Sequence, residues 1–286
     1  MTRDPTHRPT GNPTNRSPAG ASRAPAVAGR FYPRDPQALR QQVEQLLGPA
    51  VEPQSAIALV GPHAGYVYSG SILGQTYART VVPPRVVLMC PNHTGRGVAR
   101  SLWSGGPWQL PGGAIAVDEA LSAALVEHSG ATPDREAHRH EHALEVHLPF
   151  ARARQPRLRI AALCLANLDV AACRQMGEGL ARVVQQSDEP VLLVASTDMS
   201  HFLSAQRSAV LDKMALDHVL ALDPAGLHQT VHRHQISMCG VIPTTVALFA
   251  AQQLGATEAT LVRYGHSGQV SGDHDRVVGY AGVVVR

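Results

Sequence analysis

The feature that most constrains this chain is an alternation between short apolar runs and longer segments with helical patterning, which begins near residue 26. The apolar runs are bounded by glycine, proline or polar residues, as buried strands are; they cover residues 55–60, 85–90, 158–165, 191–196, 260–264 and 277–285. The intervening segments predict helices at residues 36–47, 69–79, 118–128, 141–153, 170–186, 208–222 and 242–254. This alternation predicts an α/β fold with a central mixed, mostly parallel sheet flanked by helices.

Two aspartates mark the starts of predicted helices. Asp35 is followed by Pro36, and Asp118 precedes another helical segment, which makes both aspartates candidate N-caps. Residues 103–117 are interrupted by glycine and proline clusters and predict a hairpin-like excursion. The sequence shows neither a repeat nor an internal linker, so we expect a single folded domain.

Residues 1–24 differ from the rest of the chain in composition. They are rich in Pro, Thr, Arg, Asn and Ser and show no apolar periodicity. Such a segment cannot bury enough apolar surface to offset the entropy of ordering it. We therefore expect a disordered tail over residues 1–24 and an α/β domain over residues 25–286.

Charge and hydropathy argue against two classes of partner. The net charge of +3 owes much to arginines of the predicted tail and is too small to indicate a nucleic-acid surface. No apolar run reaches the roughly 18 residues of a membrane span, and the N-terminus has no hydrophobic signal core. The four cysteines form no CxxC pair, and for three of them the default interpretation is a buried, reduced thiol. We expect a soluble, cytoplasmic protein without membrane association.

Histidines follow three of the predicted strands. The chain has 15 histidines against 4 phenylalanines, and placement decides which of them carry chemistry. His63, His93 and His201 each come shortly after a strand end, beside small residues that form tight turns. Because parallel strands place their carboxyl ends side by side, where ligands gather in α/β sheets, we expect these three histidines to share one site.

Asp198 precedes His201 by three residues, which adds a carboxylate to this group. One interpretation is a general acid–base pair or an additional set of metal ligands. The other interpretation is that Asp198 only caps the following turn.

His142 and Glu145 have the same spacing on the predicted 141–153 helix. Residues three apart share a helix face, a geometry that helical metal sites use for paired ligands. The alternative is a solvated face, which the neighbouring Glu141, His138 and His140 make plausible.

Cys239 lies just before the predicted helix at 242–254. A helix N-terminus lowers the pKa of a thiol and makes it a better nucleophile and metal ligand. The alternative is a buried free thiol. We interpret seven further histidines as surface or capping residues: His128, His138, His140, His218, His228, His232 and His234. His266 and His274 flank an SGD motif and could rim the pocket, but we assign no chemistry to them.

Seven segments follow one another in a distinctive order: PAVAGRFYP at 25–33, PHAGYVYSG at 62–70, PNH at 91–93, HALEVHLPF at 142–150, STDMSHF at 196–202, CG at 239–240, and SGD through VGY at 271–280. In this order they resemble the Memo family, also described as the B component of the AmmeMemoRadiSam system. The resemblance covers the whole chain after the predicted tail.

The resemblance implies a fold similar to that of class III extradiol dioxygenases, which are non-haem iron enzymes that open catechol rings. It implies that His63, His93 and Cys239 occupy metal-binding positions. It further implies that Asp198 and His201 line the same pocket.

The thiolate sets this ligand set apart from the dioxygenase relatives, whose third protein ligand is a carboxylate. Two imidazoles and a thiolate form a softer set, which suits iron(II) or copper and could also hold zinc. This difference argues against catechol cleavage.

Other residues of the matched motifs extend the implied pocket. His142, Glu145 and Tyr66 could line it. Cys90 stands where we expect a glycine before the PNH motif, and it either brings a second thiol near the site or packs beneath it.

These implications favour a non-haem iron- or copper-dependent redox protein that acts with an AMMECR-type and a radical-SAM partner. In this interpretation His201, oriented by Asp198, moves protons. The alternative is a non-catalytic module that binds a ligand or sequesters metal. Both interpretations use the same pocket, and the resemblance leaves open whether that pocket is catalytic.

Overall fold

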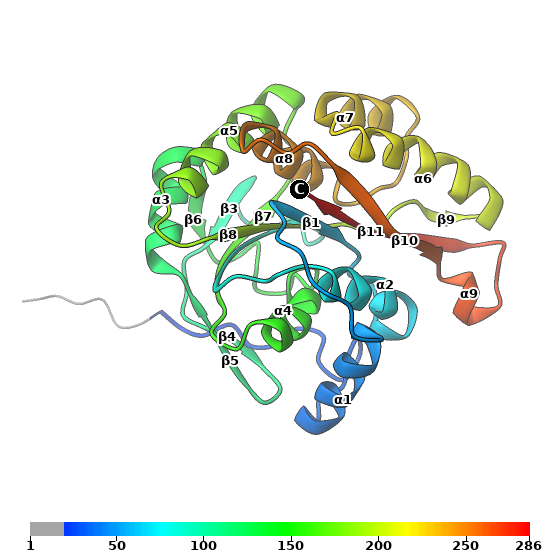
Figure 1. Ribbon diagram of the computed structural model, residues 1–286, viewed down its shortest axis with the longest axis horizontal. Coiled ribbons are helices and arrows are strands. Elements are labelled where there is room, and N and C mark those ends of the chain that lie inside the picture. The colour runs from blue at the N-terminus through cyan, green and yellow to red at the C-terminus, as the bar shows by residue number, and fades with distance from the viewer. Residues whose placement is uncertain (1–19) are drawn as a thin grey trace, which may run out of the picture.

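The computed structural model describes residues 20–286 as a mixed sheet with helices on both faces (Figure 1). Strands along its main path follow the order β10-β11-β1-β8-β2-β7-β3-β6. The strands are β1 Ala58–Gly61, β2 Arg85–Pro91, β3 Arg100–Trp103, β4 Trp108–Leu110, β5 Gly113–Val117, β6 Thr132–Asp134, β7 Arg159–Leu165, β8 Val191–Ser196, β9 His201–Leu203, β10 Ala259–His266 and β11 Val277–Val285. The four central strands β1, β8, β2 and β7 are parallel, and β11 and β3 border them antiparallel. The predicted mixed, mostly parallel sheet is confirmed.

Helices form a layer on each side of the sheet. In Figure 1, α3, α5, α7 and α8 lie on one side, and α1, α2 and α4 lie on the other. The helices are α1 Pro36–Leu47, α2 Tyr66–Ala78, α3 Glu119–Ser129, α4 Leu148–Arg154, α5 Val170–Gln185, α6 Ala205–Leu220, α7 Pro224–Arg233, α8 Val241–Gln253 and α9 Gly268–Ser271, with a 3-10 turn η1 at Glu145–His147.

The sheet divides the apolar interior into two cores. Side chains along a strand alternate between its faces. In β2, Val87 and Met89 pack into the core that α3, α5 and α8 cover, whereas Val86 and Leu88 pack into the core under α1, α2 and α4. The central strands are buried on both faces, which explains why they are continuous apolar runs in the sequence.

The predicted helix starts are observed. The Asp35 carboxylate accepts a hydrogen bond from the Ala38 amide at 2.8 Å, and that of Asp118 accepts one from the Leu121 amide at 2.9 Å. The hairpin-like excursion at 103–117 contains β4 and β5, which pair antiparallel. Side-chain capping by Asp35 and Asp118 therefore sets the starts of α1 and α3, as the sequence pattern indicates.

The predicted helix over residues 141–153 is wrong in its first part. Residues before Glu145 form turns, then η1 and α4 follow, with Pro149 in the first turn of α4. The Glu141 carboxylate accepts hydrogen bonds from the amides of His142 and Ala143, which stabilises a turn in place of a helix. His142 and Glu145 therefore do not share a helix face.

The helix α7 lies in a region where the sequence analysis predicts none. Asp223 caps it by accepting from the Gly226 amide, and Pro224 occupies its first turn. This is the same Asp-Pro signal that identifies α1.

The N-terminal end of the described chain packs against the domain. Residues 1–19 of the predicted tail lie outside the described residues, but Arg23 is only 3% exposed and bonds to the body of the domain. The described residues thus include positions 20–24 of that predicted tail. Within residues 20–286, no helix combines the length and apolarity that a membrane crossing needs.

Candidate metal centre

The candidate site lies at the carboxyl edge of the central strands. His63 follows β1, His93 follows β2 and Asp198 follows β8, and β8 pairs with both β1 and β2. Cys239 reaches the same edge from the segment that precedes α8. The parallel register therefore brings together residues that are far apart in the sequence.

Three side chains offer converging ligand atoms. One ring nitrogen each of His63 and His93 and the sulfur of Cys239 lie within 4.8 Å of one another. Cys239 Sγ is 3.4 Å from His63 Nε2. A tetrahedral ion with a nitrogen bond of about 2.1 Å and a sulfur bond of about 2.3 Å separates such ligands by roughly 3.5 Å. The donor set therefore fits a metal ion.

A buried hydroxyl fixes the orientation of the His63 ring. The Ser196 hydroxyl donates to the Ala143 carbonyl at 2.9 Å, so its oxygen accepts from His63 Nδ1 at 2.7 Å and from His147 Nε2 at 3.0 Å. His63 Nδ1 therefore carries the proton, and Nε2 presents its lone pair toward Cys239. Burial, followed by the nearby His93, lowers the pKa of His63 well below its usual value, which keeps the imidazole neutral.

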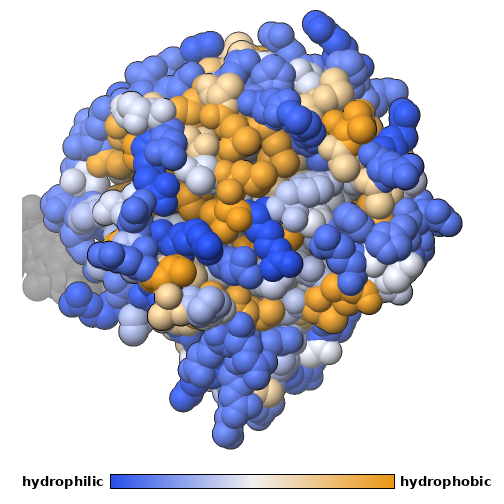
Figure 2. All heavy atoms as spheres, turned by 45° about the vertical axis from the view of Figure 1, so that its right-hand side comes forward, coloured by the Kyte–Doolittle hydropathy of each residue, from blue (hydrophilic) through white to orange (hydrophobic). Residues whose placement is uncertain are grey.

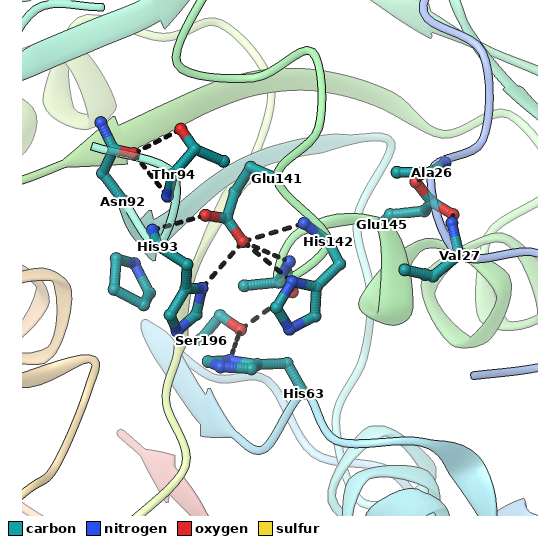
Figure 3. A network of polar contacts seen from close by, with 12 residues as sticks. Ala26, Val27, His63, Asn92, His93, Thr94, Glu141, His142, Glu145 and Ser196 are labelled. Carbon is teal, nitrogen blue, oxygen red and sulfur yellow. Dashed lines mark hydrogen bonds and ion pairs between the residues drawn. The ribbon is translucent and has the colours of Figure 1, made fainter. Parts of the chain in front are cut away.

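A buried carboxylate orients His93 (Figure 3). Glu141 Oε1 accepts from His93 Nδ1 at 2.9 Å, and Oε2 accepts from the His93 amide at 2.7 Å. Burial alone would raise the pKa of Glu141, but the hydrogen bond and charge of His93 outweigh it and lower that pKa. Burial likewise opposes protonation of His93, yet Glu141 raises the pKa of His93. A carboxylate on the outer nitrogen is the usual support of a metal-binding histidine.

His142 lies beside both metal-binding candidates. Its ring centroid is 5.0 Å from that of His93 and 5.5 Å from that of His63. With Glu141 and His93 it forms a second group whose ligand atoms lie within 4.8 Å. His142 therefore borders the site, although not through the predicted helix face.

Asp198 braces the two loops that carry His63 and Cys239. Its Oδ1 accepts from the His63 amide at 2.8 Å, and its own amide donates to Cys239 Sγ at 3.3 Å. Its Oδ2 is 3.9 Å from His63 Nε2. Burial raises the pKa of Asp198 to about 6, against the opposing hydrogen bond from the His63 amide. Asp198 therefore joins the two segments that carry His63 and Cys239, a role beyond capping its own turn.

His201 is oriented differently from the sequence-based expectation. Its Nδ1 donates to the Ser237 carbonyl at 2.8 Å, and its amide donates to the Ser237 hydroxyl at 2.7 Å. No hydrogen bond joins His201 to Asp198 in the described part of the chain. Ser237, not Asp198, therefore orients the His201 imidazole. With the proton on Nδ1, the lone pair of this ring is on Nε2.

Two residues of the predicted pocket lining belong to the core. Glu145 is fully buried, pairs with Arg23 at 2.6 Å and accepts from the Tyr32 hydroxyl at 2.6 Å. Tyr66 donates its buried hydroxyl to the Val146 carbonyl, and its ring packs on Tyr32. Both side chains are occupied by contacts that hold the N-terminal segment and α4 in place.

The two remaining cysteine expectations are decided by burial. Cys239 is half-buried, and burial, with the Asp198 charge as the next cause, raises the pKa of its thiol, which is opposite in direction to the lowering expected from the helix N-terminus. Cys90 is fully buried and pairs in register with Cys164 of β7. Cys90 therefore packs in the core.

Three supporting residues escaped the sequence analysis. Ser196 ends a predicted strand, Glu141 stands among charged neighbours, and His147 lies in a matched motif. None has a local pattern that signals its role, because their partners lie 48 to 133 positions away in the sequence.

Comparisons with known proteins match most of the chain. The family model described as Memo-like protein matches residues 23–284. The chain belongs to the Memo family. A MEMO1 family protein of Methanopyrus kandleri is 38% identical over 279 residues, covering 92% of this chain and 99% of its own length. One from Aquifex aeolicus is 36% identical over 266 residues, covering 92% and 98%.

A solved structure supports the fold alone. An uncharacterized protein from Escherichia coli K12 superposes with a TM-score of 0.51 at 15% identity, covering 78% of this chain and 98% of its own. The Memo match, by contrast, spans every residue of the metal centre described above. The predicted family membership is confirmed.

Proposed function

We propose that this Memo family protein binds iron(II) or copper through His63, His93 and Cys239 and uses the ion in a redox reaction. The observation that carries the proposal is the fixed orientation of both imidazoles. Ser196 and Glu141 occupy the Nδ1 atoms, which leaves both Nε2 atoms facing the Cys239 sulfur. A bound ion of this kind supplies Lewis acidity and a redox couple.

The residues around the ligands divide the remaining tasks. Asp198 fixes the His63 loop and Cys239, and the His142 ring packs beside the imidazoles of His63 and His93. His201 is partly exposed, and Ser237 holds its Nδ1 proton. In the proposal, Nε2 of His201 accepts a proton from the substrate.

The resemblance to the Memo system suggests partners for this activity. We propose that an AMMECR-type protein and a radical-SAM protein act with this chain. The chain lacks the CxxxCxxC motif of a radical-SAM cluster, so radical chemistry would belong to that partner.

The metal assignment is tested by purification without oxygen and measurement of bound iron and copper. His63→Ala and Cys239→Ser should abolish tight binding, whereas His234→Ala, at an exposed histidine, should bind as wild type does. Equal metal content in His63→Ala and wild type would refute the site.

The reaction is tested separately, by oxygen consumption of the metal-loaded protein with candidate substrates. His201→Ala should retain metal and lose turnover. The soft Cys239 sulfur also favours a second candidate, copper(I) sequestration. Tight copper(I) binding with no turnover in wild type would favour that candidate over the redox enzyme.

A further inference from the structure

A pair of histidines on α7 forms a cluster outside the candidate metal centre. His228 and His232 are four residues apart and project from the same helix face. Their ring centroids are 4.3 Å apart, and their Nε2 atoms are 3.2 Å apart. The pair shares no residue with the pocket at the strand ends.

A backbone oxygen completes the cluster. His228 Nε2 is also 3.1 Å from the carbonyl oxygen of Leu168, in the loop before α5. A carbonyl only accepts, and a neutral imidazole nitrogen carries at most one proton. That single proton would have to serve both Leu168 and His232. Two imidazole nitrogens and one carbonyl oxygen therefore lie close together with one hydrogen available to them.

The spacing of these atoms matches that of ligands around a small cation. Nitrogens bound to a tetrahedral ion at about 2.0–2.1 Å are separated by roughly 3.3 Å, and an oxygen ligand gives a similar spacing. The observed separations of 3.2 and 3.1 Å agree with such an arrangement. One metal ion in place of that proton would accept a lone pair from each of the three atoms.

The cluster is also accessible to solvent and supported by the fold. His228 is only 8% exposed, while His232 lies at the surface. The His228 side of the cluster is therefore enclosed by protein, and the His232 side faces solvent.

We propose that His228, His232 and the Leu168 carbonyl form a second metal site, which takes a divalent ion of the zinc(II) class. The two imidazole nitrogens favour zinc(II) over harder ions, and the carbonyl oxygen and water would complete the coordination. The ion ties α7 to the loop before α5. The site does not depend on the function proposed for the strand-end pocket.

The test is zinc(II) titration of the full chain without an affinity tag, followed by calorimetry and by metal analysis after desalting. It is performed in a Cys239→Ser background, which weakens the pocket and leaves α7 unchanged. We expect His232→Gln to lose one bound zinc(II) per chain relative to that background. His234→Gln, at an exposed histidine next to α7, should retain it.

A second readout separates metal binding from a structural role. Zinc(II) should raise the thermal unfolding midpoint of the Cys239→Ser chain and of its His234→Gln variant, but not of its His232→Gln variant. If His232→Gln binds as much zinc(II) and gains the same thermal shift, the pair is only a hydrogen bond that docks α7. That result would overturn the proposal.

Discussion

Both carboxylate oxygens of Glu141 bond to His93, one to the ring and the other to the backbone amide of the same residue. The two distances are 2.9 and 2.7 Å, and the Glu141 side chain is almost fully buried. One carboxylate therefore fixes both the position and the ring orientation of His93. It also accepts from the amides of His142 and Ala143, so it organises the whole turn beside the site.

Glu141→Gln should weaken metal binding about 10- to 100-fold, because an amide supports the imidazole less well than a carboxylate does. Competition with a chelator of known affinity measures the change. Glu136→Gln, on the exposed side of the same region, is the matched control and should bind as wild type does. An unchanged affinity in Glu141→Gln would show that the carboxylate serves the turn and not the metal.

Arg23→Met should destabilise the fold by about 3–5 kcal/mol, because it leaves the Glu145 carboxylate buried without its cation. The guanidinium also donates to the carbonyls of His138 and Glu141, so its loss loosens the turn beside the site. Urea denaturation measures the change. Arg139→Met removes an exposed ion pair and should cost less than about 1 kcal/mol. Equal losses in the two variants would contradict the prediction.

The free energy of unfolding should decrease as the pH is lowered, because His138 becomes protonated. Burial, followed by the charge of Arg23, lowers the pKa of this histidine to about 4. The unfolded chain, with a pKa of about 6.5, binds the proton first as the pH falls. The histidine therefore contributes nothing unfavourable above that pH, and stability is lost progressively between about 6.5 and about 4, by up to about 3 kcal/mol.

His138→Leu removes this titration and should flatten the pH dependence of unfolding over that interval. The slope difference between the two chains, measured by denaturant titration at several pH values, isolates His138. The pKa of His147, which burial lowers to about 3, affects both chains alike and cancels. Parallel curves for the two chains would contradict the assignment.

Gly240→Ala should both destabilise the protein and reduce metal affinity. An added Cβ would collide with the Ser196 carbonyl and the Thr197 side chain, so the segment that carries Cys239 must move. Overpacking of this kind costs about 1–3 kcal/mol. Gly272→Ala is the comparison, because its φ of +77° is unfavourable for alanine but nothing lies within 4 Å. It should lose stability by about 1–2 kcal/mol at unchanged metal affinity.

The part of the site that strands position could be predicted from the sequence. His63 and His93 each follow an apolar run, and parallel pairing forces such strand ends together. Glu141 and Ser196 could not be found in this way, because their roles depend on contacts with residues that are distant in the sequence. The predicted His142–Glu145 pair failed for a related reason: a helical spacing has no meaning where side-chain hydrogen bonds replace the helix by a turn.

The fold itself followed from local patterns wherever these were strong. The bounds of β8 and β11 agree with the predicted strands, since uninterrupted apolar runs leave little ambiguity. The short strands β6 and β9 carry no such run, and their formation depends on pairing with β3 and β11. Tertiary contacts decide these elements.

The distance in sequence between His63 and Cys239 has a consequence for biosynthesis. These residues are separated by 176 positions, so their side chains meet only after the chain through Cys239 has been synthesised and the segment before α8 has docked at the sheet edge. Contacts between such distant positions form late, because closing a long loop has a high entropic cost. A nascent chain therefore carries the two halves of the ligand set apart, and the complete set exists only in the finished fold. The group formed by His63, His93 and Cys239 is therefore completed late in folding, after the segments that carry His63 and Cys239 have come together.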